Sequence, residues 1–343
     1  MFVVTPGDIS KVLSDFEIMA EIQSASELQR YDYDASSKEV RLILKAEPVS
    51  GPPLVLRFKN EADVTLKTVE DQSRFADTLR RNGILTPFQY KSDGAFARKY
   101  EINGYKVIVT VEQFVENEVR LVDAAAAEKT GELLAKMHGI SEKENLHVAN
   151  KVLFDPFSKN DLFDFETFQS LEPGIGEDGR DVFHSITRTY HAYTEILAPL
   201  KRQPGYAVQG DISNCNLYRT ALGEIGIFDF NRCGDNNLFC DAVMQAIFEA
   251  RLMDYPDNIG DNVRPEILSS FLRGYRSVRD FSGEQKNWYP YLYAIITAFW
   301  SSDISWNEDS LTNAVKSGNR ESVQKWLRVI RDRLNRLDHT GLE

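Results

Sequence analysis

The stretch Gln209-Gly210-Asp211-Ile212-Ser213-Asn214-Cys215-Asn216 decides the fold, together with Ile227-Phe228-Asp229-Phe230 after a short turn. The first stretch contains an aspartate and, five residues later, an asparagine. The second stretch places another aspartate in an apolar strand. Magnesium binds in proteins through one or two carboxylates and the phosphates of a nucleotide, and an amide oxygen completes such a site without adding charge. The pattern indicates phosphoryl transfer, with Asp211 as the base that orients a hydroxyl and Asn216 and Asp229 as metal ligands.

The order of these residues resembles the aminoglycoside phosphotransferase and choline kinase family, small-molecule kinases on a protein-kinase-like fold. The shared motif continues through Gly234 to Asp241. The resemblance extends over most of the chain and is specific only between residues 205 and 245. It implies an α+β fold with a small antiparallel sheet lobe that binds the nucleotide, residues 1–113, and a larger, mainly helical lobe for catalysis and acceptor binding, residues 114–343.

One residue of the motif departs from the family. Gln209 stands where the family usually has histidine, directly before Gly210-Asp211. In kinase-like folds that histidine packs and hydrogen-bonds beneath the metal-binding segment, and an amide can take over part of that role. The departure therefore bears on full activity and not on the fold. Asp and Asn are also common in ordinary turns, so no single residue identifies the motif. The complete set of residues at the correct spacing is what indicates it.

Length and composition are typical of a cytoplasmic enzyme. A chain of 343 residues is long enough for two lobes, each with its own core. No run approaches the roughly 18 apolar residues of a membrane span, and residues 1–8 lack the features of a signal peptide. The three cysteines, Cys215, Cys233 and Cys240, form no C-x-x-C pair, which argues against a disulfide framework and a zinc site.

The net charge of -12 bears on the partners of the protein. It argues against nucleic acid as the main partner, because nucleic-acid-binding domains carry basic patches. It is compatible with a cationic small acceptor, such as an aminoglycoside or a choline-like amine, which the field of the protein would attract.

Two alternating stretches near the N-terminus, 39–46 and Leu54–Lys59, predict neighbouring strands. In the second, a period of two places Phe58 and the leucines on one face and Arg57 and Lys59 on the other. The family resemblance implies that Arg57 grips the nucleotide phosphates, with Lys59 as the reserve. The alternative is a solvated cationic edge.

A helix is expected to begin within Asn60–Asp63 and to end at Asn82-Gly83, a C-terminal signal. Counted back from that end, the ion-pairing glutamate of the family falls on Gln72. Glu70 lies about 200° away around the helix, so it cannot face the same cation. Either Gln72 makes a neutral hydrogen bond to Arg57, or the helix is aligned with the family in a different register.

The stretch Val107–Val115 reads as a buried strand that turns polar and resembles the connector between the lobes of the family. The resemblance implies that the backbone from Glu112 to Phe114 meets the adenine edge. Residues 1–113 contain no G-x-G-x-x-G loop that could cover the phosphates, and the nearest segment of small residues there is Gln23–Leu28.

Helices account for most of the remainder. Asp123 is a predicted N-cap for a helix to His138, a histidine that we interpret as structural. Residues 172–179 predict a flexible loop, and the helix Val182–Leu200 after it either caps the acceptor pocket or fills the large lobe. The aromatic residues of 287–306 are either core or a site for an ammonium group, and 321–337 predicts an amphipathic terminal helix.

Three functions are compatible with these features. The first is an ATP- or GTP-dependent, magnesium-dependent phosphotransferase for an aminoglycoside or another aminated acceptor, favoured by an acidic pocket around Asp235 and Asp303. The second is the same chemistry on a homoserine- or sugar-type metabolite, favoured by an arginine that reads a carboxylate. The third is a non-catalytic, kinase-like nucleotide-binding protein, which Gln209 and Gln72 support and the intact Asp211, Asn216 and Asp229 oppose.

Overall fold

The computed structural model describes residues 1–34, 38–116, 118–119, 122–152, 155–251 and 263–342. Two compact units share the chain. The first unit is Met1–Val119 with Leu146–Asn150 and Cys215–Cys233, and the second unit is Arg120–Asn145 with Lys151–Asn214 and Gly234–Glu343. The motif found in the sequence therefore supplies residues to both units.

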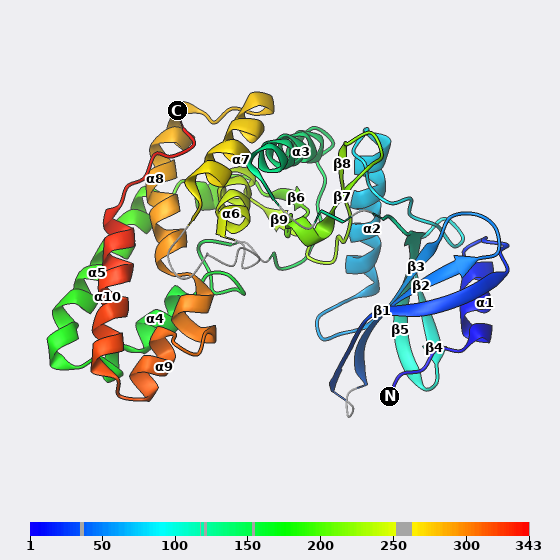
Figure 1. Ribbon diagram of the computed structural model, residues 1–343, viewed down its shortest axis with the longest axis horizontal. Helices are drawn as coiled ribbons and strands as arrows, with labels where there is room; N and C mark the ends of the chain where they lie inside the picture. Colours follow the sequence, from blue (N-terminus) through cyan, green and yellow to red (C-terminus); the bar gives the residue numbers. More distant parts are fainter. Residues whose placement is uncertain (35–37, 117, 120–121, 153–154, 252–262, 343) are drawn as a thin grey trace. The chain divides into compact units, whose positions relative to one another are not determined.

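The first unit is built on a five-stranded antiparallel sheet with the strand order β1-β2-β3-β5-β4 (Figure 1). Two short strands, β7 and β8, lie between the predicted metal ligands Asn216 and Asp229 in the chain and form a separate antiparallel pair. The elements are α1 (Pro6–Asp15), β1 (Ile22–Asp34), β2 (Glu39–Pro48), β3 (Leu54–Asn60), α2 (Leu66–Arg81), β4 (Ala97–Ile102), β5 (Tyr105–Gln113), β7 (Leu217–Arg219) and β8 (Ile225–Ile227).

Helix α1 covers one face of this sheet. A capping box between Thr5 and Asp8 begins the helix, and Pro6 occupies its first turn. The apolar side of α1 and the alternate residues Leu54, Leu56 and Phe58 of β3 belong to one buried cluster. The predicted alternation of β3 is thus confirmed, and Arg57 and Lys59 point to the opposite face of the sheet.

Helix α2 begins later than the sequence predicted. Strand β3 continues through Asn60, and the helix starts after Thr65, whose side chain accepts a hydrogen bond from the Thr68 amide. Its end is as predicted, because Asn82 is the C-cap and Gly83 follows with a φ of 89°. The expected start at Asn60–Asp63 was therefore wrong by about one turn, since Asn60 ends the strand and a turn at Ala62-Asp63 precedes the helix.

The second unit is mainly helical and has one two-stranded sheet, β6-β9. Its helices and strands are α3 (Ala124–Lys143), α4 (Phe165–Ser170), α5 (Glu177–Ile196), β6 (Tyr206–Val208), β9 (Gly234–Asn236), α6 (Leu238–Arg251), α7 (Pro265–Val278), α8 (Gly283–Ala298), α9 (Leu311–Lys316) and α10 (Arg320–Asn335). Short 3-10 turns occupy Glu172–Gly174, Leu200–Arg202 and Asn214–Asn216, and a π-helical turn occupies Ser302–Trp306. The α+β class with an N-terminal sheet is confirmed.

Several expectations for the second unit can be compared with these helices. Asp123 caps α3 as predicted, through a hydrogen bond from the Ala126 amide. The loop expected at 172–179 is instead a 3-10 turn that leads directly into α5, which begins at Glu177 and not near Val182. The aromatic residues of 287–306 are mostly core, as one interpretation held, although Trp306 remains 61% exposed. Within the described ranges, no helix is long and apolar enough to cross a membrane.

Candidate active site

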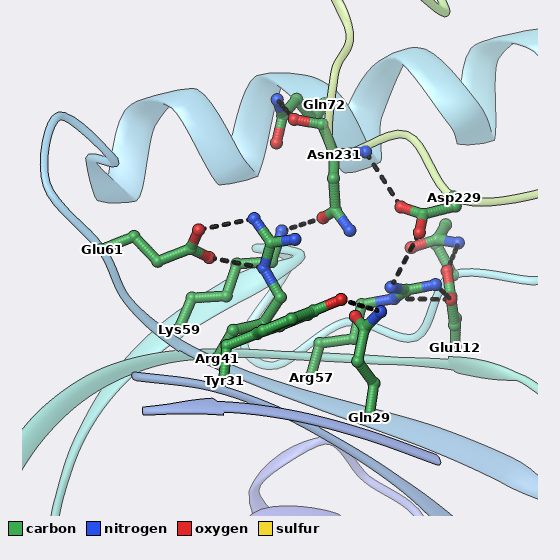
Figure 2. Close-up of polar contacts among 11 residues, drawn as sticks. Gln29, Tyr31, Arg41, Arg57, Lys59, Glu61, Gln72, Glu112, Asp229 and Asn231 are labelled. Atoms are coloured by element: carbon green, nitrogen blue, oxygen red, sulfur yellow. Dashed lines mark hydrogen bonds and ion pairs between the residues drawn. The ribbon is translucent and has the colours of Figure 1, made fainter. Parts of the chain in front are cut away.

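Arg57 is the centre of a buried polar network in the first unit (Figure 2). Its Nε donates to Glu112 Oε1 at 2.9 Å, and its Nη2 lies 2.8 Å from the same oxygen. Its Nη1 lies 3.6 Å from Asp229 Oδ2. Arg57 is only 8% exposed and lies on a strand with a neighbour on each side, so the alternative of a solvated cationic edge is wrong.

The charges of this network support one another. Burial lowers the pKa of Arg57, but the carboxylates of Glu112 and Asp229 outweigh it and raise that pKa. Burial would likewise raise the pKa of Asp229, but the cations of Arg57 and Lys59 outweigh it and lower that pKa. Arg57 is therefore a permanent cation, and Asp229 is a carboxylate at neutral pH.

Lys59 provides a second buried cation on the same face of β3. It is 5% exposed, and its Nζ donates to the side-chain oxygen of Asn231. Burial and the neighbouring Arg57 lower its pKa to about 8. The structure thus brings both predicted phosphate-binding residues, Arg57 and Lys59, to the segment that carries Asp229.

Gln72 does not bond to Arg57. Its amide nitrogen donates to the backbone oxygens of Asn231 at 2.9 Å and Cys233 at 3.2 Å, which ties α2 to the segment after Asp229. Glu70 faces elsewhere, as helix geometry required, and one of its oxygens accepts from the Phe96 and Ala97 amides. Of the two alternatives for Gln72, the neutral hydrogen bond to Arg57 is therefore wrong: Gln72 bonds to the backbone of Asn231 and Cys233, and Glu112 bonds to Arg57.

Asn216 and Asp229 lie on neighbouring short segments of the first unit. Strands β7 and β8 pair Leu217 with Ile227, and the next bond runs from the Phe228 amide to the Asn216 carbonyl at 2.9 Å. Asp229 follows with a φ of 57°, a left-handed conformation that is uncommon outside glycine. An amide and an ionised carboxylate are hard oxygen donors, so these two residues fit a divalent cation that also binds phosphates.

Asp211 belongs to the second unit, where buried side chains hold its backbone. The Asp211 amide donates to Gln209 Oε1 at 2.8 Å, and the Ile212 amide donates to Gln245 Oε1 at 3.0 Å. Gln209 thus hydrogen-bonds to the backbone of the motif, two residues along the chain. No pattern in the sequence pointed to Gln245, which follows Asp241 by one helical turn on α6.

A chain of buried hydrogen bonds continues from Gln245. Its amide nitrogen donates to Asp241 Oδ1 at 3.3 Å, and Asp241 Oδ2 lies 3.0 Å from His138 Nε2. His138 Nδ1 lies 2.9 Å from the Tyr275 hydroxyl. His138 is 1% exposed between α6 and α7, which agrees with its interpretation as a structural residue.

Two amides of the connector segment are engaged within the first unit. The Gln113 amide donates to the Phe88 carbonyl at 2.9 Å and the Phe114 amide to the Pro53 carbonyl at 2.8 Å, so a purine would need other main-chain groups here. Lys45 Nζ stands over the Phe114 ring, 4.4 Å from its centroid. The glycine-loop substitute expected at Gln23–Leu28 is corrected, because these residues are part of β1 and pair with β2.

Asp303 is not an open acidic group. Its Oδ2 lies 2.6 Å from an Arg251 nitrogen and 2.8 Å from an Arg333 nitrogen, and the residue is 2% exposed. Burial raises the pKa of this carboxyl, but the two arginines outweigh it and lower it. Asp303 is therefore already paired with arginines and cannot serve in the predicted acidic pocket for an ammonium group.

Comparison with known proteins places this fold and motif in a family. The family model described as the phosphotransferase enzyme family matches residues 27–281 of the chain. The protein belongs to this family. It is accordingly an enzyme of the small-molecule kinase type, which transfers a phosphoryl group to a hydroxyl. Among curated proteins, none matches the sequence.

Solved structures share the fold over nearly the whole chain. A microcompartment-associated aminopropanol kinase has 15% identity and a TM-score of 0.57 over 98% of this chain and 99% of that chain. An amicoumacin kinase in complex with AMP-PNP, Ca2+ and Ami has 15% identity and a TM-score of 0.59 over 98% and 97%. An aminoglycoside phosphotransferase from Alicyclobacillus acidocaldarius has 11% identity and a TM-score of 0.54 over 98% of each chain. The protein-kinase-like fold is thereby confirmed.

Proposed function

We propose that this phosphotransferase moves the γ-phosphate of ATP or GTP to a hydroxyl of a small aminated acceptor, with Mg2+ as cofactor. The observation that carries the proposal is the grouping of an ionised Asp229, its neighbour Asn216 and the buried cation Arg57 in one unit. Oxygen ligands beside a fixed cation are what a metal-bound nucleotide needs, since phosphoryl transfer depends on positioning and charge stabilisation.

Each residue has a distinct role in this proposal. Arg57 and Lys59 hold the phosphates that are not transferred, and Asp229 and Asn216 hold the metal. When bound, Mg2+ neutralises charge on the phosphate oxygens. Asp211 accepts a hydrogen bond from the acceptor hydroxyl and aligns it for in-line attack on the γ-phosphate. The bonds of Gln209 and Gln245 to the backbone at Asp211 and Ile212 keep that carboxylate in place.

An aminated acceptor is favoured by two observations. The chain has a net charge of -12, which attracts cations. The structures of similar fold include kinases named for aminopropanol and for aminoglycosides. The two arginines on Asp303 weaken this preference, so a homoserine- or sugar-type metabolite remains the second candidate.

Turnover measurements test the proposal. Purified protein with Mg2+ and ATP or GTP is assayed against aminoglycosides, amino alcohols, choline, homoserine and sugars. We expect turnover stimulated by one acceptor class, abolished by Asp211→Asn with nucleotide affinity retained. Asp229→Asn should also remove the metal-dependent part of nucleotide binding. Wild-type levels of turnover in either variant would overturn these roles, and absence of both nucleotide binding and turnover would favour the non-catalytic alternative.

A further inference from the structure

The buried arginine of the site is anchored from within the sheet. Strand β5 supplies Glu112, which bonds to Arg57, whereas α2 presents the neutral Gln72 to the same small cavity. That cavity, about 20 Å³ in volume, is lined by both side chains and by Arg57 itself. Helix α2 therefore contributes no charged side chain to this cavity that could hold Arg57 in place.

We infer that Glu112 is the positioning residue for the nucleotide-binding cation, and that Gln89 orients it. This inference rests on the proposed function, because it assigns Arg57 to the nucleotide phosphates. In this arrangement, nucleotide binding by Arg57 depends on two adjacent central strands, β3 and β5. It does not depend on a charged side chain of α2.

The geometry of Glu112 fits this role. In the β3–β5 ladder Arg57 pairs with Thr110, so Glu112 is its diagonal neighbour on the same face of the sheet. Glu112 is 7% exposed, and Oε1 receives both arginine contacts. Its second oxygen, Oε2, accepts from Gln89 Nε2 at 2.7 Å, and Gln89 is also buried. Both oxygens are thus fixed, which leaves the carboxylate one orientation.

The same contacts leave one edge of the guanidinium available. Glu112 occupies Nε and Nη2, while Nη1 has no hydrogen-bond partner in the part of the chain that the structure describes. Asp229 Oδ2 is 3.6 Å from Nη1, an ion-pair distance without a hydrogen bond. A buried donor without an acceptor is costly, and a phosphate oxygen of a bound nucleotide would satisfy it.

Gln72 has a separate task in this arrangement. Its two bonds to the backbone oxygens of Asn231 and Cys233 fasten α2 to the segment that follows Asp229. An amide serves there because it donates protons, which a carboxylate at this position would not do. The chain therefore uses Gln72 to hold a backbone segment and Glu112 to hold the cation.

Nucleotide kinetics of Glu112→Gln test the inference. Without the carboxylate, Arg57 is expected to turn toward Asp229 and compete with the metal. We expect the KM for the nucleotide to rise about tenfold or more, with a much smaller change in kcat. Glu70→Gln, which alters a carboxylate bound to the Phe96 and Ala97 amides, is the matched control and should keep the wild-type KM.

The outcomes separate this inference from the proposed function. If wild-type protein turns over nucleotide and Glu112→Gln keeps the same KM, the inference is overturned and the kinase assignment stands. If wild-type protein neither binds nor turns over nucleotide, the proposed function fails first. Should Glu112→Gln not fold, Gln89→Leu replaces it, because it removes the second bond of Glu112 and keeps the charge. A rise in KM of about threefold supports the inference, and an unchanged KM overturns it.

Discussion

Gln245 Oε1 lies 3.0 Å from the Ile212 amide, directly after the candidate base Asp211. Gln245 is completely buried on α6, and its amide nitrogen is held in turn by Asp241. The backbone beside the base is therefore held by the core of the second unit and not by local turn contacts alone. In the proposed function, Gln245 is therefore a positioning residue for the Asp211 carboxylate.

Replacement of Gln245 by leucine should reduce kcat. The Ile212 amide would lose its acceptor inside the core, which costs about 1–3 kcal/mol, and the segment would relax. We expect kcat to fall about ten- to hundredfold, with nucleotide affinity within about twofold of wild type, because the proposed phosphate-binding residues Arg57 and Lys59 belong to the first unit. Steady-state kinetics and nucleotide titration measure the two quantities. The exposed Gln169→Leu is the control, and an equal loss of affinity and kcat in Gln245→Leu would contradict the assignment.

Lys59 should give the nucleotide kinetics a pH dependence. Its pKa of about 8 means that the free enzyme loses this cation as the pH rises above 8. We expect kcat/KM for the nucleotide to fall about tenfold between pH 7.5 and 9, because only the protonated amine holds phosphate. Lys59→Arg should abolish that decline, since a guanidinium stays charged. An identical decline in Lys59→Arg would assign the titration to another group.

The elements that sequence predicted best are those with a strong local period. The alternation of 39–46 and Leu54–Lys59 predicted β2 and β3, and Asp123 marked the start of α3. The start of α2 was missed because Asn60–Asp63 has the composition of a helix N-terminus while the ladder with β2 keeps Asn60 in the strand. Tertiary pairing thus overrode a local signal.

Chemistry that fixes the residue type is what a sequence can indicate. Asn216 and Asp229 are proposed as metal ligands from their spacing, and β7–β8 pairing places their segments side by side, with Phe228 opposite Asn216. The partner of Arg57 was not identified, because Glu112 is 55 residues away in the chain and a charged residue in a strand carries no sign of the partner it meets. Gln245 was missed for the same reason, since its contact to Ile212 spans 33 residues.

Glu249 should make stability depend on pH. It is completely buried on α6, and neither carboxylate oxygen has a hydrogen-bond partner among the described residues. Burial raises its pKa from the usual 4.5 to about 8. Between these values the folded state keeps a proton that the unfolded state has lost, so the free energy of unfolding falls as the pH rises from about 4.5 to about 8, on the order of 1.4 kcal/mol per unit.

Glu249→Gln tests this relation, because the amide does not titrate. Relative to wild type, the variant should gain stability as the pH rises from 5 to 8, by several kcal/mol at most. Urea unfolding across that range measures the difference, with the exposed Glu308→Gln as the control. Parallel pH profiles for wild type and Glu249→Gln would show that Glu249 is not the group responsible.

Gly131 and Gly274 allow α3 and α7 to approach at backbone distance. A Cβ at Gly274 would lie 1.9 Å from the Glu128 carbonyl oxygen, and one at Gly131 would lie 2.0 Å from that of Phe271. Backbone atoms cannot move aside as a flexible side chain can, so we expect each alanine to destabilise the protein by about 2–3 kcal/mol or more. Gly139→Ala, on α3 with open space around its Cβ, should instead be neutral or stabilise by about 0.5–1 kcal/mol. Chemical unfolding of the three variants measures this, and equal stabilities would exclude the close packing of the two helices.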